Sequence, residues 1–369
     1  MKKNPSVWIL LLTCLALNSC SLIKPASQPP RVSSVFPLQE DSRILYDGEI
    51  NRLVRPSGGR LYYTTQKGIL YCIDTANKKI AWTFSAHAGA WAPPHLDGSK
   101  IYFADEENGV YCLDETGTLV WEKKLPEKNT GDFGLEAGKL ALATQAGNVL
   151  ALDALTGEEV WRFDAGSPVQ SGPVFWNSQI IFGTEAGQLI FLRPDGKRLA
   201  EFTTGSPLRG PLFIDRNRLF FSLQSGMFNS LDLASRKRRW RFQTGGFLTA
   251  PPVADQKRIY FLNSNSILFC LDKKRGELVW WKSLPARDSF GLETRGEEIL
   301  VSSLSPLWLG FYKKDGEKSG SYDAGQELKS NALALDSHFV INLYERETGQ
   351  GILAFLSREN AAPGNPQKK

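Results

Sequence analysis

The chain of 369 residues is poor in the residues and motifs that mark enzymes and metal sites. Its three histidines show neither the His-x-His nor the His-Glu-x-x-His spacing of metal ligands. It contains no Gly-x-Ser-x-Gly elbow, no phosphate-binding loop and no cysteine–histidine pair at the spacing of a catalytic family. The sequence therefore nominates no catalytic residue and no metal ligand.

Excess charge and helical periodicity are also scarce. The 44 Lys and Arg side chains exceed the 39 Asp and Glu side chains by only five, which does not indicate a nucleic-acid partner. No segment carries a sustained helical period, because glycines and prolines interrupt the chain about every ten residues. With 42% hydrophobic residues the chain is still too apolar to be disordered, so we expect an all-β fold.

The sequence of the first twenty residues differs in kind from the rest. Lys2 and Lys3 precede an apolar run at residues 7–17 (VWILLLTCLAL), and this run is too short to span a bilayer as a mature helix. A basic start, a short apolar segment and small residues at the end are typical of a secretory signal peptide. We therefore assign residues 1–19 to a signal that is removed on export.

Residues 17–20 (LNSC) resemble a bacterial lipobox, in which the cysteine becomes the lipid-modified first residue of the mature chain. This resemblance implies that Cys20 carries acyl chains such as palmitate and anchors the protein; a soluble exported protein cut nearby is the alternative. Ser21 follows where an aspartate would favour the inner membrane, so the outer membrane, with the protein facing the periplasm, is expected. Residues 20–31 are rich in Pro and Ser and are predicted to be a flexible tether.

Tryptophans recur along the chain at a fixed spacing. Trp82, Trp121, Trp161, Trp240 and Trp280 are separated by 39, 40, 79 and 40 residues. Degenerate copies occupy the doubled gap and the region after the last tryptophan, which gives eight units of about forty residues. Each unit resolves into four short strands; in the sixth these are residues 250–255, 258–263, 266–272 and 277–283. Repeated four-stranded antiparallel units predict a β-propeller, since one such sheet cannot bury both of its faces alone.

The last unit indicates how the ring closes. It offers strands near residues 331–336, 339–344 and 351–357 but no fourth strand, whereas residues 32–48 precede the first complete unit and belong to none. We expect the N-terminal strand to complete the eighth blade, which removes an exposed edge. A seven-bladed ring is the alternative, if residues 287–322 are a long excursion. The propeller domain then covers residues 32–358, and residues 359–369 form a disordered polar tail.

The repeated residues have structural roles in this interpretation. Aspartates that end the third strand are expected to accept backbone N–H bonds in the following turn; these are Asp74, Asp114, Asp153, Asp232 and Asp272. Glycines such as Gly157 are expected at positive φ in the same turn, and the tryptophans to bridge neighbouring blades with the indole N–H directed at a carbonyl. Cys72, Cys112 and Cys270 share one position in the repeat and are predicted to be small buried residues rather than disulfide or metal partners.

Residues 147–161 (GNVLALDALTGEEVW) resemble the PQQ-like repeat of the quinoprotein dehydrogenases, and the resemblance extends over about residues 43–357. Those enzymes hold a quinone over calcium in the central funnel, beside a disulfide between adjacent cysteines. This chain has no Cys-Cys pair and no acidic calcium loop. We therefore expect no cofactor and no enzyme activity, with a PQQ-dependent or other enzyme of this class as the alternative.

The combination of lipobox, tether and eight PQQ-like blades resembles the BamB family of lipid-anchored propellers in the outer-membrane β-barrel assembly machinery. This resemblance implies a non-catalytic scaffold that binds an assembly component or a client peptide. In that family a Leu-Arg-Gly loop holds the barrel-forming subunit, and residues 206–213 (SPLRGPLF) are similar to it. The resemblance thus implies that Leu208 and Arg209 contact a protein partner.

Two further groups of residues differ between the units and are candidate contacts. Apolar and aromatic residues of the segments that connect blades are expected to be exposed and to bind a protein or an extended peptide; they are Trp91, Phe133, Leu208, Phe247, Leu248 and Phe290. A basic cluster replaces the usual turn of the repeat at Arg236, Lys237, Arg238, Arg239 and Arg241. This cluster is either a solvated face or a contact with an anionic surface such as lipid headgroups. A propeller that binds an envelope glycan is a third functional alternative.

Overall fold

The described part of the chain is built from β-strands. This computed structural model describes residues 31–54, 58–90, 92–169, 171–285, 289–335 and 338–359, with the side chains of residues 51, 52, 131, 289 and 290 excepted. Residues 1–30 lie outside it, including the predicted signal peptide and Cys20, as do Trp91 and the tail beyond residue 359. Over the described ranges, no helix has the length and apolar character needed to cross a bilayer.

The strands form eight four-stranded antiparallel sheets, which are the blades of a propeller. From the inner to the outer strand, blade 1 contains β2 (Ile50–Val54), β3 (Arg60–Thr65), β4 (Ile69–Asp74) and β5 (Lys79–Ser85), and blade 2 contains β6 (His95–Asp97), β7 (Lys100–Ala104), β8 (Gly109–Asp114) and β9 (Leu119–Lys124). Blade 3 contains β10 (Asn129–Glu136), β11 (Lys139–Thr144), β12 (Asn148–Asp153) and β13 (Glu159–Asp164), and blade 4 contains β14 (Val174–Trp176), β15 (Gln179–Gly183), β16 (Gln188–Leu192) and β17 (Arg198–Thr203). Blade 5 contains β18 (Leu208–Asp215), β19 (Arg218–Leu223), β20 (Met227–Asp232) and β21 (Lys237–Gln243), and blade 6 contains β22 (Val253–Ala254), β23 (Arg258–Leu262), β24 (Ile267–Asp272) and β25 (Leu278–Ser283). Blade 7 contains β26 (Ser289–Arg295), β27 (Glu298–Ser303), β28 (Leu307–Tyr312) and β29 (Lys318–Asp323), and blade 8 contains β30 (Leu333–Ala334), β31 (Phe339–Glu345), β32 (Gln350–Arg358) and β1 (Leu38–Asp47).

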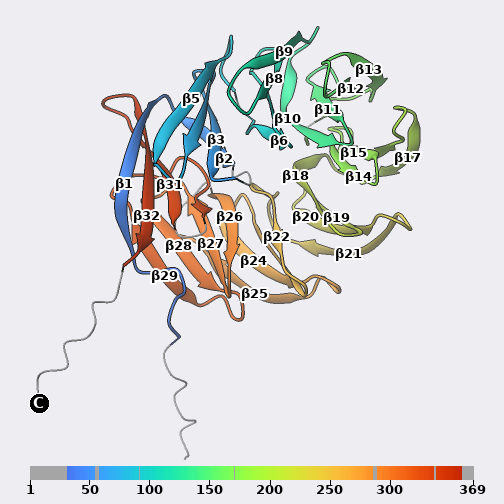
Figure 1. The fold of residues 1–369 in the computed structure, drawn as a ribbon. Helices are drawn as coiled ribbons and strands as arrows, with labels where there is room; N and C mark the ends of the chain where they lie inside the picture. Colours follow the sequence, from blue (N-terminus) through green and yellow to red (C-terminus); the bar gives the residue numbers. More distant parts are fainter. Residues whose placement is uncertain are drawn as a thin grey trace, which may run out of the picture. The chain divides into compact units, whose positions relative to one another are not determined.

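The N-terminal strand closes the ring, as predicted. β1 pairs antiparallel with β32, from Leu38 opposite Arg358 to Asp47 opposite Gln350. Figure 1 shows the consequence, because the blue start of the propeller lies directly beside its red end. The eight-bladed ring is therefore confirmed, and the seven-bladed alternative is wrong because β26 to β29 form a blade of their own.

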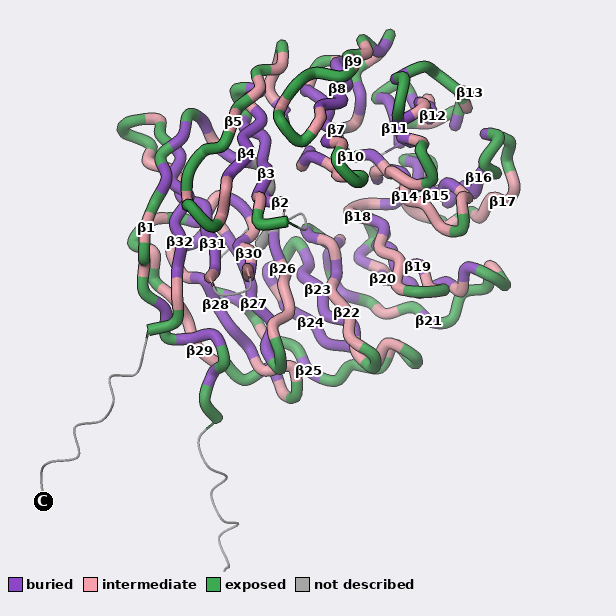
Figure 2. Tube along the Cα trace, in the orientation of Figure 1, coloured by how far each residue is buried: buried purple, intermediate pink, exposed green. Residues whose placement is uncertain are grey.

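The hydrophobic core lies between the blades. Buried apolar residues of the described chain fall into eight clusters, and each cluster joins two neighbouring blades. The second and third strands of the blades are buried almost continuously, whereas the outer strands expose alternate residues (Figure 2). This difference follows from stacking, since the middle strands are covered on both faces by adjacent blades and the outer strands face solvent at their free edge.

The ring has two faces with different connections. One carries the turns between the first and second strands and the hairpins between the third and fourth strands, and we call it the hairpin face. The other carries the turns between the second and third strands and the segments that cross from one blade to the next, and we call it the crossing face. Each aspartate that ends a third strand caps its hairpin as predicted; Asp153, for example, accepts bonds from Leu155 N (2.9 Å) and Thr156 N (3.0 Å).

Five tryptophans dock consecutive blades through one arrangement. Each indole N–H donates to a backbone carbonyl 33 residues later, at 3.0 Å in every case; the pairs are Trp82–Glu115, Trp121–Ala154, Trp161–Pro194, Trp240–Lys273 and Trp280–Lys313. A glycine at positive φ in the next hairpin lies under each ring. A Cβ at Gly316 (φ +71°) would stand 2.7 Å from the Trp280 ring, so the glycine provides both the turn conformation and the space for the indole.

Candidate functional site

The Leu-Arg-Gly segment begins β18 and is largely explained by packing. Leu208 is only 1% exposed, and its side chain fills the space beside Gly183 of blade 4. Val169, Leu248 and Leu328 hold the same position in other blades, where each forms a β-bridge to the second strand. The prediction that Leu208 is exposed is therefore wrong, because the residue at this position of the repeat is apolar and buried between neighbouring blades.

The other two residues of the segment differ in role. Gly210 has a positive φ of 80°, and a Cβ there would stand 2.4 Å from the Leu248 carbonyl oxygen, so only glycine fits. Arg209 lies on the crossing face and is half-exposed, while its backbone carbonyl accepts a hydrogen bond from the Ser222 hydroxyl. Arg209 is thus the side chain of the motif that is presented outward.

The aromatic candidates on the segments between blades are less exposed than predicted. Phe133 and Leu248 are buried, because each packs in the cluster between its blade and a neighbour. Phe247 is half-exposed on the crossing face, whereas Trp91 and the Phe290 side chain lie outside the described residues. The predicted exposure is thus wrong for Phe133 and Leu248, and it is confirmed in part for Phe247.

The basic cluster forms the hairpin of blade 5 and the start of β21. Lys237, Arg238, Arg239 and Arg241 are exposed, and Arg239 pairs with Asp232 at 2.9 Å. Arg236 is different, because it is half-buried at a positive φ of 54° with its guanidinium 6.0 Å from the centre of the Phe191 ring. Four of the five side chains therefore face solvent, and one packs between blades 4 and 5.

Two cavities line the centre of the ring between the inner strands. One, of about 560 Å³, lies among blades 1, 2, 7 and 8, and the other, of about 280 Å³, lies among blades 2 to 5. His95 borders both, and its Nε2 atom lies 2.9 Å from Asp132 Oδ1 across the junction of blades 2 and 3. The His95 ring also packs against Phe133, with 4.3 Å between ring centres and 34° between the ring planes. No pattern in the sequence predicted this pair, since the two residues lie in different repeats.

These central groups do not fit a quinone held over calcium. Glu293 accepts a hydrogen bond from the Ala334 backbone at 2.8 Å, Glu136 accepts one from Ser178 N at 2.8 Å, and Asp132 pairs with His95. All three acids that line the two cavities therefore hold neighbouring blades together. Among the residues that the structure describes, no group of three or more His, Cys, Asp or Glu side chains is placed to bind a metal ion. Most of the other lining residues are apolar in type, with Pro93, Pro94 and Pro173 among them.

The cysteines of the repeat are buried and unpaired, as predicted. Cys72, Cys112 and Cys270 are free thiols, and each stands opposite a docking tryptophan on the neighbouring strand. Burial raises the pKa of the Cys270 thiol to about 12. A thiol in this environment is a poor nucleophile, which favours a packing role.

Comparison with known proteins relates residues 31–335 to one family. The family model described as "Outer membrane protein assembly factor BamB" matches residues 31–130, 85–282 and 224–335. The BamB of Nitrosomonas eutropha is 28% identical over 157 residues, which cover 40% of this chain and 37% of that protein. The aligned region thus spans well under half of that relative's length.

Two further matches show how far the similarity to known proteins extends. Subunit 1 of the methanol dehydrogenase of Methylorubrum extorquens is 31% identical over 164 residues, which cover 36% of this chain and 26% of that protein. The crystal structure of BamB from Moraxella catarrhalis superposes with a TM-score of 0.74 over 89% of this chain and 99% of that chain, at 15% identity. At this identity the superposition supports the fold alone.

Proposed function

The chain belongs to the BamB family of outer membrane protein assembly factors, and we propose that it is a non-catalytic scaffold of the cell envelope. In this proposal residues 1–19 are cleaved, Cys20 carries lipid in the outer membrane, and residues 20–31 tether the propeller in the periplasm. The propeller then binds proteins that take part in outer-membrane protein assembly. The observation that carries the proposal is the family match, which extends from residue 31 to residue 335.

The central groups support a scaffold rather than an enzyme. The acids that line the channel are engaged in contacts between blades, and the cysteines are buried within the sheets. Residues shared by most blades are used for turns and docking, so a site must lie where the blades differ. The quinoprotein alternative requires a cofactor that these groups do not match.

We place the protein contact on the crossing face around Arg209. Arg209 is half-exposed, and so is Phe247, which belongs to the next segment that crosses between blades. Arginine and aromatic side chains are common anchors of protein interfaces. Leu208 supports the contact only indirectly, because it is buried beneath the segment.

Crosslinking in intact cells, followed by purification and identification of partners, tests this function. Arg209→Glu is the probe, and Thr249→Glu is the matched control, because Thr249 is exposed at the same position in the next blade. We expect Arg209→Glu to reduce recovery of an outer-membrane assembly protein at least about tenfold, the loss of a single hot-spot side chain. Unchanged recovery with Arg209→Glu would remove this contact from the proposal.

The enzyme alternative has its own test. Purified protein is mixed with calcium and pyrroloquinoline quinone, and then freed of unbound ligand. We expect no retained absorbance beyond the aromatic band and no alcohol-dependent reduction of a dye. A retained quinone chromophore with turnover would overturn the non-catalytic assignment.

A further inference from the structure

The hairpin face has an uneven distribution of charge around the ring. The hairpins of blades 4 to 7, at residues 193–198, 232–239, 272–277 and 312–318, carry thirteen basic and six acidic side chains. The corresponding hairpins of blades 2 and 3, at residues 114–118 and 153–159, carry five acidic side chains and no basic ones. One half of this face is therefore cationic and a neighbouring sector is anionic, although the net charge of the chain is small.

Much of the positive charge is exposed and lacks a counter-ion. Within the described ranges, several exposed cations of the hairpin face of blades 5 to 7 form no ion pair; they are Arg216, Lys237, Arg238, Lys257, Lys274, Lys314 and Lys318. Neighbouring hairpins and turns also adjoin one another, since Arg218 of blade 5 donates to the Lys273 carbonyl of blade 6 and Arg258 of blade 6 donates to the Lys313 carbonyl of blade 7. The cations thus form one continuous surface rather than isolated sites, and we call it the basic arc.

The N-terminal segment joins the propeller on this same face. Ser33 and Ser34 bind Glu298, the first residue of β27, with Ser34 N donating to the carboxylate at 2.6 Å. The turn before β27 accepts a hydrogen bond from Lys313 of the basic arc, at 2.6 Å between Lys313 Nζ and Gly296 O. Ser33, the first residue of the propeller unit, therefore lies at the edge of the basic arc.

The length of that chain limits how far the arc can be from a membrane anchor. The compact unit of the propeller begins at Ser33, so thirteen residue-to-residue steps lead from Cys20 to it. Thirteen residues span at most about 45 Å when fully extended. A lipid on Cys20 would thus keep the edge of the basic arc within about 45 Å of the leaflet that contains the anchor. This tether lets the arc approach the anionic headgroups, which attract Lys and Arg within about a Debye length.

We propose that the basic arc docks onto anionic phospholipid headgroups of the membrane leaflet that holds the anchor. The phosphate groups replace the missing counter-ions of the exposed cations, and the acidic hairpins of blades 2 and 3 tilt away from the same surface. This orientation leaves the crossing face, with Arg209, directed away from the lipid. The inference rests on the proposed membrane location of the chain, but the interaction itself needs no acyl chain.

Vesicle binding by an unlipidated protein tests the inference. The chain from residue 20 onward with Cys20→Ser retains the whole compact unit and cannot be lipidated. We expect it to co-sediment with phosphatidylcholine vesicles that contain phosphatidylglycerol, to leave pure phosphatidylcholine vesicles unbound, and to dissociate as salt is raised. The triple variant Lys237→Glu, Arg238→Glu, Lys274→Glu is expected to bind at least about tenfold more weakly.

The control changes the net charge by the same amount on the opposite face. Lys67→Glu, Lys128→Glu and Arg346→Glu reverse three exposed cations of the crossing face and are expected to leave binding nearly unchanged. Thermal unfolding of both variants confirms that the propeller is intact. Equal loss of binding in the two variants, or no preference of the parent protein for phosphatidylglycerol, would overturn the inference.

The anchor is tested separately, by the mass of the N-terminal peptide and by membrane fractionation of the lipidatable chain. A missing lipid with intact vesicle binding would contradict the anchor and leave the basic arc supported. A lipidated peptide without vesicle binding would support the anchor and contradict the arc.

Discussion

The interfaces between blades are of two kinds, and the difference shows which residues of the repeat depend on one another. Five interfaces are docked by tryptophan over a hairpin glycine, whereas among the described residues no indole docks on a hairpin glycine in this way after blades 4, 7 and 8. In blade 4 the tryptophan position is Ala200, which stands opposite Phe191, and in blade 8 it is Ser42, which stands opposite Phe355. The docked interfaces have Cys, Ala or Ser where these phenylalanines stand.

The hairpin glycine is replaced together with the tryptophan. Arg236 and Lys78 occupy its position after blades 4 and 8, and both keep a positive φ, at 54° and 51°. Each places its cation over the substituted phenylalanine, with Lys78 Nζ 5.7 Å from the Phe355 ring centre. A side chain is tolerated there because no indole covers the Cβ position, although a non-glycine residue at positive φ costs about 1–2 kcal/mol. The hairpins that receive no docking tryptophan thus keep the aspartate and the turn geometry of the repeat, but they do not keep its glycine.

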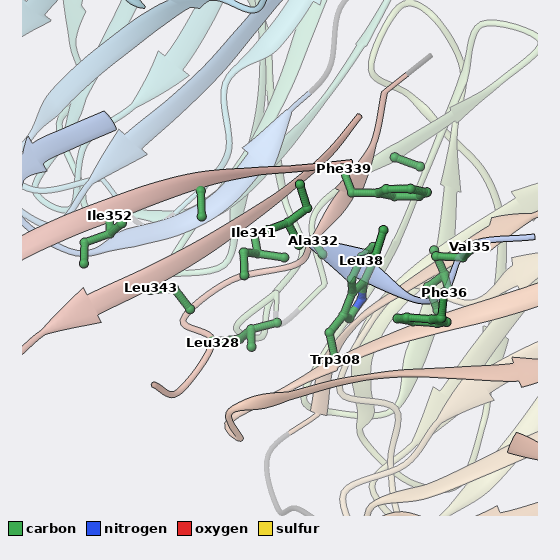
Figure 3. Packing of buried hydrophobic residues seen from close by; sticks show 14 residues of the cluster. Val35, Phe36, Leu38, Trp308, Leu328, Ala332, Phe339, Ile341, Leu343 and Ile352 are labelled. Carbon is green, nitrogen blue, oxygen red and sulfur yellow. The ribbon is translucent and has the colours of Figure 1, made fainter. Parts of the chain in front are cut away.

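The interface after blade 7 is completed from outside the repeats. Gly310 and Gly320 leave a space in the outer half of this blade, and Phe36 of the N-terminal segment fills it, against Trp308 (Figure 3). Glu298 holds the same segment through Ser33 and Ser34. Blade 8 has no hairpin between its third and fourth strands, so an aromatic residue supplied by the incoming chain takes the place of docking on a hairpin.

The largest effect is expected from removing a docking tryptophan. Trp280→Ala removes a side chain that is 8% exposed together with its bond to the Lys313 carbonyl, and should lower the free energy of unfolding by about 3–5 kcal/mol. The adjacent Trp281 is 53% exposed, so Trp281→Ala should cost less than about 1 kcal/mol. Urea unfolding of both variants measures the contrast, and equal losses would refute the docking role.

A somewhat smaller effect is expected at the interface that uses the N-terminal aromatic residue. Phe36→Ala empties the space beside Trp308 and should lower the free energy of unfolding by about 3 kcal/mol. Hydrogen exchange should show the extra opening first in β1 and β29, the strands on either side of this segment. Val32→Ala, at a residue 78% exposed, is the control and should leave exchange unchanged.

Loss of the buried carboxylate should have a pH-dependent effect. Burial opposes ionisation of Glu298, but hydrogen bonds from Ser319, Ser34 and Ser33 outweigh it and hold the pKa of the carboxyl below its ordinary value. Its stabilising contribution is therefore fully present above about pH 4.5 and is lost as the pH falls through the depressed pKa. Glu298→Gln should lower the free energy of unfolding by about 1–3 kcal/mol at pH 7 and by progressively less in acid.

Its neighbour provides the control for that experiment. Glu297 is exposed in the same turn, so Glu297→Gln should leave the stability at pH 7 unchanged within about 0.5 kcal/mol. A Glu298→Gln variant whose stability differs from the parent by the same amount at pH 3 and pH 7 would contradict the role of the ionised carboxylate.

The smallest effect is expected from rebuilding the docking motif after blade 4. Phe191→Ala, Ala200→Trp and Arg236→Gly together recreate the residues of a docked interface, whereas each change alone leaves a cavity, an overfilled space or a lost contact. The free energy of unfolding of the triple variant should exceed the value expected from adding the three single effects by about 1–2 kcal/mol. Additive effects would show that glycine and tryptophan are not coupled.

The sequence predicted the fold because each repeated residue acts through local geometry or through its nearest blade. Tryptophan spacing indicated the units, and the unpaired residues 32–48 predicted the closing strand. The exposure of Leu208 was predicted wrongly because a leucine suits either a protein contact or a buried position between blades. Its burial beside Gly183 depends on a residue of another blade. Phe36 gave no signal, since it lies outside the repeats.

Glu298 could have been found from the repeat pattern. The first residue of the second strand is a cation in five other blades, at Arg60, Lys100, Lys139, Arg218 and Arg258. Four of these cations donate to a carbonyl in the following blade, whereas Glu298 accepts bonds from the N-terminal segment. A carboxylate where five other blades have a cation therefore marks the interface at which the neighbouring segment offers an N–H donor instead of a carbonyl oxygen. The His95–Asp132 pair has no such pattern and required the structure.

The central claim is that function lies where the blades differ, with protein on the crossing face and lipid on the hairpin face. Site-specific photo-crosslinking in living cells tests it directly, with the reactive group at Gln224, beside the segment of Arg209, or at Lys274 of the basic arc. We expect discrete protein adducts from position 224 that Arg209→Glu abolishes, and lipid adducts without protein adducts from position 274. The same protein adducts from both positions, or from position 274 alone, would contradict the account.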